Sequence, residues 1–339
     1  MVPVMRLPDV IRVDVDSYGY LSLKTELLAI LQAPRSKITA DGKNLLLAMS
    51  NFCGFYCNTA LSLTQLPRKS TRFHPVIDLD DALSFANQVA DKARRIAMGH
   101  FLQGLAVEHK GDDSPVTIAD RSIESFIRAQ IAETFPHHGI YGEEEGVENI
   151  DRRHVWVVDP IDGTKSFITG HPLFGGLLAL LEDGKPCLGQ IDMPATGERW
   201  CGVAGQTSTL NGQPCRTSGR KELAAATAYT TDPLLFTGPK AAAFEALRAS
   251  TRLIRFGGDC YNYALLASGH CDLVLETRLE PYDYLPVVQV IRGAGGVITD
   301  WQGRPLTIAS SGDVLAAATP ELHDAMLQKL TAMQEHQAT

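Results

Sequence analysis

Three features are scarce in this 339-residue sequence: basic charge, long apolar runs and paired cysteines. Lysine and arginine number 31 against 39 aspartates and glutamates, which gives a formal net charge of −8. A protein that coats nucleic acid needs a basic face for the phosphate backbone, so this balance argues against that class. It leaves open a small anionic substrate that is held by a metal ion or by a local cationic pocket.

The seven cysteines are odd in number and scattered, and no two have the CxxC spacing. This pattern is typical of neither a disulfide framework nor a zinc ribbon, and it favours a reducing compartment. The first ten residues lack the charged and apolar regions of a secretory signal. The most apolar segment, 45–63, is interrupted by serine, asparagine and threonine, so we expect no membrane span. These observations predict a cytoplasmic protein without a membrane partner.

Regular hydrophobic patterning begins only near residue 78. We expect residues 1–75 to be a poorly packed extension, or the result of a start codon assigned upstream of Val76. If Val76 is the start, a chain that begins near His74 should keep full activity. We expect residues 76–339 to form the folded domain, with subdomains at about 76–215 and 216–339.

Helices and short strands follow one another through this domain. Apolar residues at helical spacing predict helices that begin at Asp78 and over about 120–135, 240–249, 262–268, 285–293 and 320–333. Buried β-rich runs predict strands over 155–158, 173–181, 186–193, 273–275 and 296–299. Because no repeat of 20 to 50 residues is present, this mixture indicates a layered α/β (α+β) fold.

The most informative stretch runs from Asp159 to Thr164, with the sequence DPIDGT, directly after a strand-like run. Pro160 restricts the backbone and cannot extend a hydrogen-bonded ladder, and Gly163 can adopt positive φ. Asp162 and Thr164 add a carboxylate and a hydroxyl. The simpler interpretation is a turn with a helix cap, because aspartate, glycine and threonine are common in turns.

Two further acidic groups flank this stretch at a distance. Glu143 lies in the segment Gly-Glu-Glu-Glu after a short apolar run, and Asp283 lies where a strand-like run gives way to a helix. Taken singly, these are a solvated acidic loop and a helix N-cap. Taken together, they form an oxygen-only donor set of the kind that Mg²⁺ prefers, and no histidine or cysteine cluster favours zinc. Several carboxylates repel one another unless cations hold them.

This combination of GEE, DPIDGT and a later acidic residue before a helix resembles the inositol monophosphatase superfamily of Mg²⁺-dependent phosphatases. The segments 110–120 and 293–300 are similar to two further elements of that family, although Arg292 and Gly293 replace its usual T-E pair. Tyr282 stands where the family has tryptophan. The resemblance covers residues 78–335 and implies an alternating α-β-α-β-α sandwich.

The resemblance also implies a set of metal ligands and two or three Mg²⁺ ions per site. Glu143 and Asp159, with the main-chain carbonyl of Ile161, match the ligands of the first ion. Asp159, Asp162 and Asp283 match the ligands of the second.

Catalytic groups are implied in the same way. Asp120 and Thr164 match the residues that position the attacking water, and Glu143 also touches that water. Gly163 and Thr164 would bind the phosphate through main-chain N–H groups. The implied reaction is hydrolysis of a phosphate ester by in-line attack of water activated by the metal, without a covalent enzyme intermediate.

We expect the segment 255–263 to set substrate specificity. It resembles the R-x-G-G-D-C-Y element of the histidinol-phosphate phosphatase branch. Histidinol phosphate carries a primary ammonium and an imidazole, and Asp259 could pair with the ammonium. The alternative is that Asp259 caps the helix that begins near Tyr261.

A second candidate for substrate contact is Glu276. It lies seven residues before Asp283, where the family has a glutamate that contacts the substrate. The alternative is a simple ion pair with Arg278.

We therefore predict a Mg²⁺-dependent phosphomonoesterase that converts L-histidinol phosphate to L-histidinol and phosphate in histidine biosynthesis. The alternative within the class is an inositol-1-monophosphatase or a sugar-phosphate phosphatase of broad specificity. A nucleotide bisphosphate phosphatase would need a basic pocket for a second phosphate, and a non-catalytic relative would be expected to have lost site carboxylates. The resemblance also implies a homodimer that acts on a small phosphate monoester, not on nucleic acid.

Overall fold

The computed structural model describes residues 14–15, 21–22, 77–103, 108–109 and 115–337. The chain divides into two units, residues 1–74 and 75–339. In the first unit only the antiparallel pair β1 (Asp14–Val15) and β2 (Leu21–Ser22) is described. The expectations for the extension and for segment 45–63 otherwise lie outside the described residues. In the part of the chain that the structure describes, no helix is long and apolar enough to cross a membrane.

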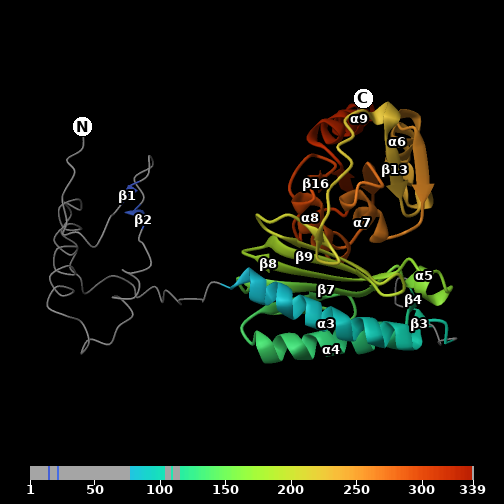
Figure 1. Cartoon of the computed structure of the whole chain (residues 1–339). Coiled ribbons are helices and arrows are strands. Elements are labelled where there is room, and N and C mark those ends of the chain that lie inside the picture. Colours follow the sequence, from blue (N-terminus) through green and yellow to red (C-terminus); the bar gives the residue numbers. More distant parts are fainter. Residues whose placement is uncertain (1–13, 16–20, 23–76, 104–107, 110–114, 338–339) are drawn as a thin grey trace. The chain divides into compact units, whose positions relative to one another are not determined.

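The second unit stacks helices and sheets in five alternating layers, as Figure 1 shows. An outer pair of helices covers one face of a large sheet, a middle pair lies between the large and a smaller sheet, and a further pair covers the smaller sheet. The six helices of these layers are α3 (Leu79–His100) and α4 (Ile118–Thr134), α7 (Tyr261–Ala267) and α8 (Pro281–Gly293), and α6 (Ala241–Ser250) and α9 (Pro320–Gln337). The predicted layered α/β fold is therefore confirmed.

The large sheet has eight strands in the order β12-β11-β10-β9-β8-β7-β5-β6. Its neighbours pair antiparallel except for β5 and β7, which are parallel. The strands are β5 (Gly139–Gly142), β6 (Val147–Glu148), β7 (His154–Asp162), β8 (Gly175–Glu182), β9 (Lys185–Met193), β10 (Glu198–Val203), β11 (Thr209–Leu210) and β12 (Gln213–Pro214). Because β5 and β7 run in the same direction, their carboxyl ends and the loops that follow lie at one edge of the sheet.

The smaller sheet has five strands in the order β14-β13-β15-β17-β16. The pairs β13–β14 and β13–β15 are parallel, and the remaining pairs are antiparallel. The strands are β13 (Thr227–Thr230), β14 (Leu253–Phe256), β15 (Leu273–Glu276), β16 (Val297–Asp300) and β17 (Val314–Ala317). The short helix α5 (Thr164–Ile168) and the pair β3 (Glu108–His109) and β4 (Pro115–Val116) lie outside the layers.

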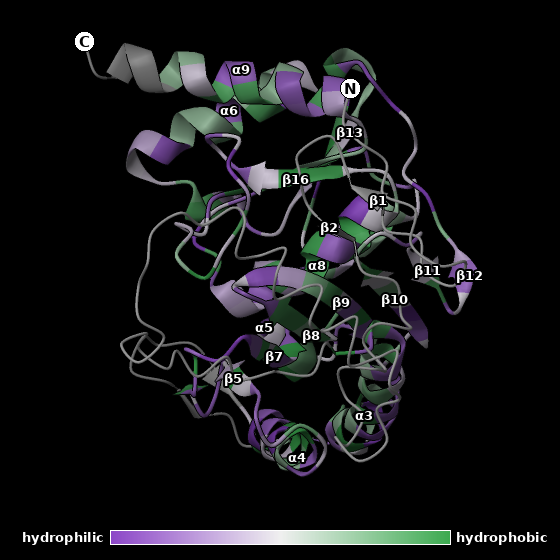
Figure 2. Ribbon diagram, turned by 90° about the vertical axis from the view of Figure 1, so that its left-hand side faces the viewer, coloured by the Kyte–Doolittle hydropathy of each residue, from purple (hydrophilic) through white to green (hydrophobic). Residues whose placement is uncertain are grey.

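Helices α3 and α4 form where the spacing of apolar residues predicts them. Asp78 caps α3 by accepting a hydrogen bond from the Asp80 amide at 2.9 Å. Figure 2 shows hydrophilic and hydrophobic residues on both helices, as expected for amphipathic helices that cover a sheet. Their buried residues include Ala86 and Val89 of α3 and Ile123 and Ile127 of α4, which share a core cluster with the large sheet.

Two glycines bring the middle helix α8 close to the large sheet. Gly189 of β9 and Gly202 of β10 are cross-strand partners. A Cβ atom at Gly189 would lie 2.0 Å from the Pro286 carbonyl oxygen, and one at Gly202 would lie 2.3 Å from the Gln289 carbonyl oxygen. Only glycine therefore permits this approach of helix backbone to sheet.

Among the element boundaries that differ from the prediction are the end of β7 and the start of α8. Strand β7 continues through Pro160 to Asp162, because a register shift between Asp159 and Asp162 lets pairing resume opposite Gly175. Helix α8 begins at Pro281, four residues before the predicted start. Proline is favoured in the first turn of a helix, where its missing N–H is not needed.

Candidate active site

Three carboxylates converge where β7 ends and α8 begins. One carboxylate oxygen from each of Asp159, Asp162 and Asp283 can be chosen so that all lie within 4.8 Å of one another. Asp159 and Asp162 come from the bulged end of β7, and Asp283 comes from the first turn of α8. Asp283 is not the N-cap residue, which is Glu280; it accepts a hydrogen bond from the Glu280 amide at 2.7 Å. That hydrogen bond uses Oδ2 of Asp283, so its Oδ1 atom is available to the carboxylate cluster.

The electrostatics of this cluster suit a bound cation. Burial, with the neighbouring carboxylates of Glu143, Asp162 and Asp283, raises the pKa of Asp159 well above its usual range. Burial and the charge of Asp162 raise the pKa of Asp283 well above its usual range. Burial and the charge of Asp259 raise the pKa of Asp162 to about 7. A divalent cation would remove this repulsion and stabilise the charged carboxylates. A metal ion that prefers oxygen ligands therefore fits these residues.

Asp120 is fully buried in the first turn of α4. Its Oδ2 atom accepts hydrogen bonds from the amide of Thr117 at 2.9 Å and from the Thr117 hydroxyl at 2.5 Å. Its Oδ1 atom is buried and has no hydrogen-bond partner. Burial raises the pKa of Asp120, and the charge of Glu143 adds to this rise. A buried oxygen without a partner suits a ligand or water that the site would bind.

Glu143 follows β5 and its amide donates to the Val158 carbonyl of β7 at 3.2 Å. Its side chain is close enough to Asp159 for the two carboxyl groups to share a hydrogen bond. The segment Gly142–Gly146 is therefore more than a solvated acidic loop. A buried glutamate of α4, Glu124, accepts hydrogen bonds from the main-chain amides of Glu144 at 2.7 Å and Glu145 at 2.9 Å.

The turn after β7 places the other predicted groups. Gly163 has a left-handed backbone, with φ +79° and ψ 40°, and precedes α5. The Thr164 hydroxyl donates to the Ile161 carbonyl oxygen at 3.1 Å. The structure thus brings the predicted groups of residues 161–164 together within one turn, next to the acidic cluster.

Asp259 approaches this turn from the loop before α7. Its Oδ2 atom would lie 2.9 Å from a Cβ placed on Gly163, so glycine leaves room for the carboxylate. The Ser166 hydroxyl donates to the same oxygen at 3.3 Å. The N-cap of α7 is Cys260, which makes no side-chain cap bond. Asp259 itself has φ +47°, an unfavourable backbone for a residue other than glycine.

Glu276 is buried at the end of β15, and its partners are threonines. It accepts hydrogen bonds from the Thr231 amide at 2.7 Å, the Thr231 hydroxyl at 2.9 Å and the Thr230 hydroxyl at 3.2 Å. The alternative partner Arg278 donates instead to the Thr237 hydroxyl, so that interpretation is wrong. Burial raises the pKa of Glu276 to about 8.

Several residues that shape the site were not predicted. Glu124 and Ser166 act on the segments that carry Glu143 and Asp259, and the buried hydroxyl of Tyr263 has no hydrogen-bond partner. The signal for Glu124 was its position one turn after Asp120 on an amphipathic helix. Nothing in the local sequence signals Ser166, because its partner is 93 residues away.

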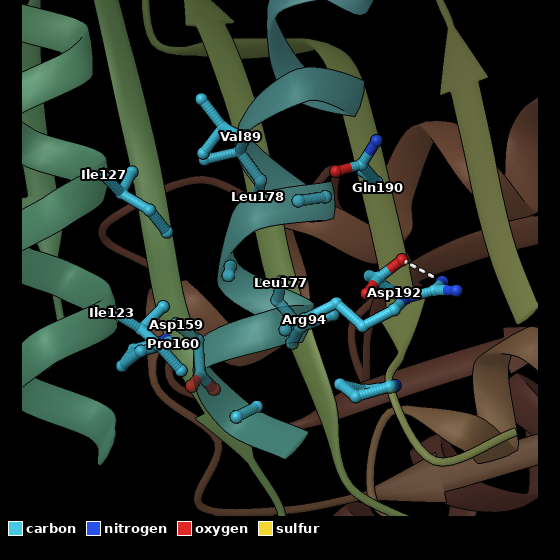
Figure 3. Close-up of a pocket in the computed structure, with 15 residues that line it drawn as sticks. Val89, Arg94, Ile123, Ile127, Asp159, Pro160, Leu177, Leu178, Gln190 and Asp192 are labelled. Atoms are coloured by element: carbon cyan, nitrogen blue, oxygen red, sulfur yellow. Dashed lines mark hydrogen bonds and ion pairs between the residues drawn. The ribbon is translucent and has the colours of Figure 1, made fainter. Parts of the chain in front are cut away.

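A cavity of about 30 Å³ lies behind Asp159, between α3, α4 and the large sheet (Figure 3). Most of its lining is apolar, with Val89, Ile123 and Ile127 among the residues around it. Its polar side is the ion pair of Arg94 with Asp192, whose Nη2 and Oδ1 atoms lie 2.5 Å apart. The volume suits one ordered water and not a substrate.

Comparison with known proteins agrees with this arrangement. The sequence model of the inositol monophosphatase family matches residues 78–335. The bifunctional phosphatase IMPL2 of Arabidopsis thaliana, a chloroplastic protein, is 42% identical over 81% of this chain and 83% of its own length. The histidinol-phosphatase of Chlorobaculum parvum is 37% identical over 69% of this chain and 91% of its own length.

A solved structure agrees as well. The inositol monophosphatase of Zymomonas mobilis is 41% identical and superposes with a TM-score of 0.69 over 76% of this chain and all of its own. The family resemblance predicted from the motifs is confirmed: this chain belongs to the inositol monophosphatase family.

Proposed function

We propose that this phosphatase is a Mg²⁺-dependent phosphomonoesterase whose substrate is L-histidinol phosphate, with L-histidinol and phosphate as products. The observation that supports this choice is the carboxylate of Asp259 beside Gly163 and the acidic cluster. The charges of Lys165 and His171 already act on this carboxylate. A substrate that brings an ammonium group next to its phosphate ester would add a cation as a direct partner, whereas an uncharged ring would add none.

The roles of the acidic residues follow from their positions. In this proposal Glu143, Asp159, Asp162 and Asp283 hold the ions, together with the Ile161 carbonyl. Bound Mg²⁺ would supply charge neutralisation and water activation, as metal ions do in phosphate hydrolysis. The number of ions, two or three, belongs to the proposal.

The remaining groups orient the reactants. Asp120 lies within electrostatic reach of Glu143, and its buried, unpartnered Oδ1 atom could accept a proton or a hydrogen bond from the attacking water. The Thr164 hydroxyl adds a second polar group from the turn that follows β7. The amides of Gly163 and Thr164 would hold the phosphate, and Glu276 would contact the polar end of the substrate away from the ester.

The test compares phosphate release from L-histidinol phosphate and from myo-inositol 1-phosphate, each with Mg²⁺ and with EDTA. We expect turnover of histidinol phosphate at a kcat/KM at least tenfold higher, and loss of both activities with EDTA. A preference for the inositol ester would retain the metal site and reject histidinol phosphate as the substrate. Full activity in EDTA would reject the metal site.

The second candidate is an inositol-1-monophosphatase. It is favoured by the solved relative from Zymomonas mobilis and by inositol monophosphatase 3 of tomato, which is 30% identical over 74% of this chain. The same assay distinguishes the two activities. We also propose that the protein is a cytoplasmic homodimer; light scattering during size-exclusion chromatography would measure the mass of the assembly, and fractionation of the source cell its location.

A further inference from the structure

The loop that carries Glu143 is attached to helix α4 by a buried carboxylate. Glu124 is fully buried, and its two oxygens accept hydrogen bonds from consecutive main-chain amides, those of Glu144 and Glu145. These amides directly follow Glu143. A carboxylate that accepts from two successive amides through both of its oxygens fixes the orientation of the peptide planes between them.

The charge of Glu124 is balanced within the same contact. Arg128, one helical turn later, donates from Nε to Glu124 Oε1 at 2.9 Å. Its Nη2 atom donates to the Gly146 carbonyl at the far end of the loop. The pair therefore holds both sides of the turn, and Ser125 adds a hydrogen bond to the Glu145 side chain.

The glycine at position 142 of the loop is required by the contact with Glu124. A Cβ atom on Gly142 would lie 2.0 Å from Glu124 Oε1, so a side chain at this position would displace the carboxylate. Gly142 has no positive φ, which means that space and not backbone conformation requires the glycine. The residue before the proposed ligand is thus small because Glu124 lies against it.

Helix α4 places two carboxylates one turn apart. Asp120 has a buried, unpartnered oxygen and lies within electrostatic reach of Glu143, and Glu124 holds the peptides that follow Glu143. We propose that Glu124, with Arg128, is a positioning residue that sets the Glu143 carboxylate at the distance from Asp159 and Asp120 that metal binding needs. This inference rests on the proposed metal site.

The test replaces Glu124 with glutamine and measures binding of MgCl₂ by titration calorimetry. The amide has one acceptor where the carboxylate has two, so one of the two loop amides loses its partner. We expect Mg²⁺ affinity at least tenfold weaker than in the wild type. At saturating Mg²⁺, KM for the phosphate ester should stay within about twofold, because the substrate contacts lie elsewhere.

The matched control is Asp300→Asn. Asp300 is also buried, accepts on Oδ1 from the amides of Gln302 at 2.9 Å and Arg304 at 2.8 Å, and pairs through Oδ2 with an arginine four residues later, so D300N removes a buried charge and its ion pair. It lies at the end of β16 and not at the site. If D300N weakened Mg²⁺ binding as much as E124Q, the effect would be general instability and the inference would be wrong.

Other outcomes are equally decisive. Mg²⁺ affinity of E124Q within twofold of the wild type, with Asp159→Asn unable to bind, would overturn the positioning role and leave the metal site intact. If wild-type protein bound no Mg²⁺, the proposed function and this inference would both fail. Should E124Q not fold, Glu124→Asp keeps the charge and shortens the reach, and we expect a smaller loss of Mg²⁺ affinity; an unchanged affinity would overturn the inference.

Discussion

The main-chain amide of Cys260 donates a hydrogen bond to Asp162 Oδ2 across 2.5 Å. This bond joins the end of β7, which carries part of the acidic cluster, to the loop that carries Asp259. The burial of Cys260 against Met193 keeps the amide in place, with Sγ and Sδ 3.8 Å apart. This hydrogen bond thus links the proposed metal site to the proposed specificity loop. A change in the position of one is expected to shift the other.

Repulsion within the cluster predicts an unusual effect of Asp159→Asn. Since burial and like charges raise the pKa of Asp159, the folded state loses stability as the pH rises above 3.8, the ordinary value, until the raised pKa is passed. At about pH 8 without metal, D159N should raise the Tm by about 2–4 °C, the shift that ~1 kcal/mol produces in a domain of this size. The same variant should lose phosphatase activity.

Scanning calorimetry with EDTA and then with MgCl₂ checks this. Wild-type protein should gain Tm on addition of Mg²⁺, by about 5 °C at a hundredfold excess over Kd, and D159N should not. Asp272→Asn serves as a control, because Asp272 accepts from the Thr227 amide outside the cluster and its loss should lower the Tm. A D159N protein that is less stable than the wild type without metal would contradict the prediction.

The proposed specificity predicts that the charge of Asp259 matters more than its shape. Asp259→Asn keeps an acceptor for Ser166 but removes the negative charge. We expect kcat/KM for histidinol phosphate to fall about 10–100-fold, as the loss of a charge-assisted hydrogen bond of ~1.5–3 kcal/mol implies. Inositol 1-phosphate should lose less than threefold. Equal losses for both esters would reduce Asp259 to a structural role.

Close packing of α8 on the large sheet predicts that Gly189→Ala is severe. The added Cβ would lie 2.0 Å from the Pro286 carbonyl oxygen, and neither backbone can move without disturbing the layer. We expect a loss of at least about 3 kcal/mol in the free energy of unfolding. Gly99→Ala, in an exposed and unobstructed position of α3, should gain up to ~1 kcal/mol. Urea titration of both variants measures the difference, and similar stabilities would show that the approach of α8 tolerates a side chain.

Acid should destabilise the protein through His138. The buried Trp156 indole donates to His138 Nδ1 at 3.1 Å, and the His138 ring stacks on Phe135. Burial, with repulsion from His154 and His137, lowers the pKa of His138 to about 4. The neutral ring is thus favoured in the folded state. Its contribution to stability is present above about pH 6.5, the ordinary histidine value, and is lost as pH falls through about 4.

Urea midpoints between about pH 7 and pH 4 measure this effect. His138→Gln, which keeps an acceptor for the indole, should flatten the pH dependence. His137→Gln changes the exposed neighbouring residue and should leave most of the pH dependence of the urea midpoint unchanged. The prediction fails if both variants follow the wild-type curve.

Prediction from the sequence was strongest where a local pattern is sufficient. The spacing of Ala86 and Val89 indicates an amphipathic helix, and DPIDGT indicates a carboxylate pair after a strand, because both depend on neighbours a few residues apart. Boundaries at Pro160 and Pro281 were wrong because β-bulge pairing and first-turn proline depend on partner strands and on packing. His137 is exposed, whereas its neighbour His138 packs inward on aromatic rings, and no local pattern separates the two.

The chain by itself determined the layered class and the family and indicated the acidic residues of the candidate site, because residue type and spacing carry that information. Only the tertiary structure decided their relations: which oxygens meet, why Gly142 and Gly163 lack side chains, and that Glu276 pairs with threonines and not with Arg278. Such contacts join residues that are 18 to more than 90 positions apart. Their distances are set by how β7, α4 and α8 pack, and no local pattern encodes that packing.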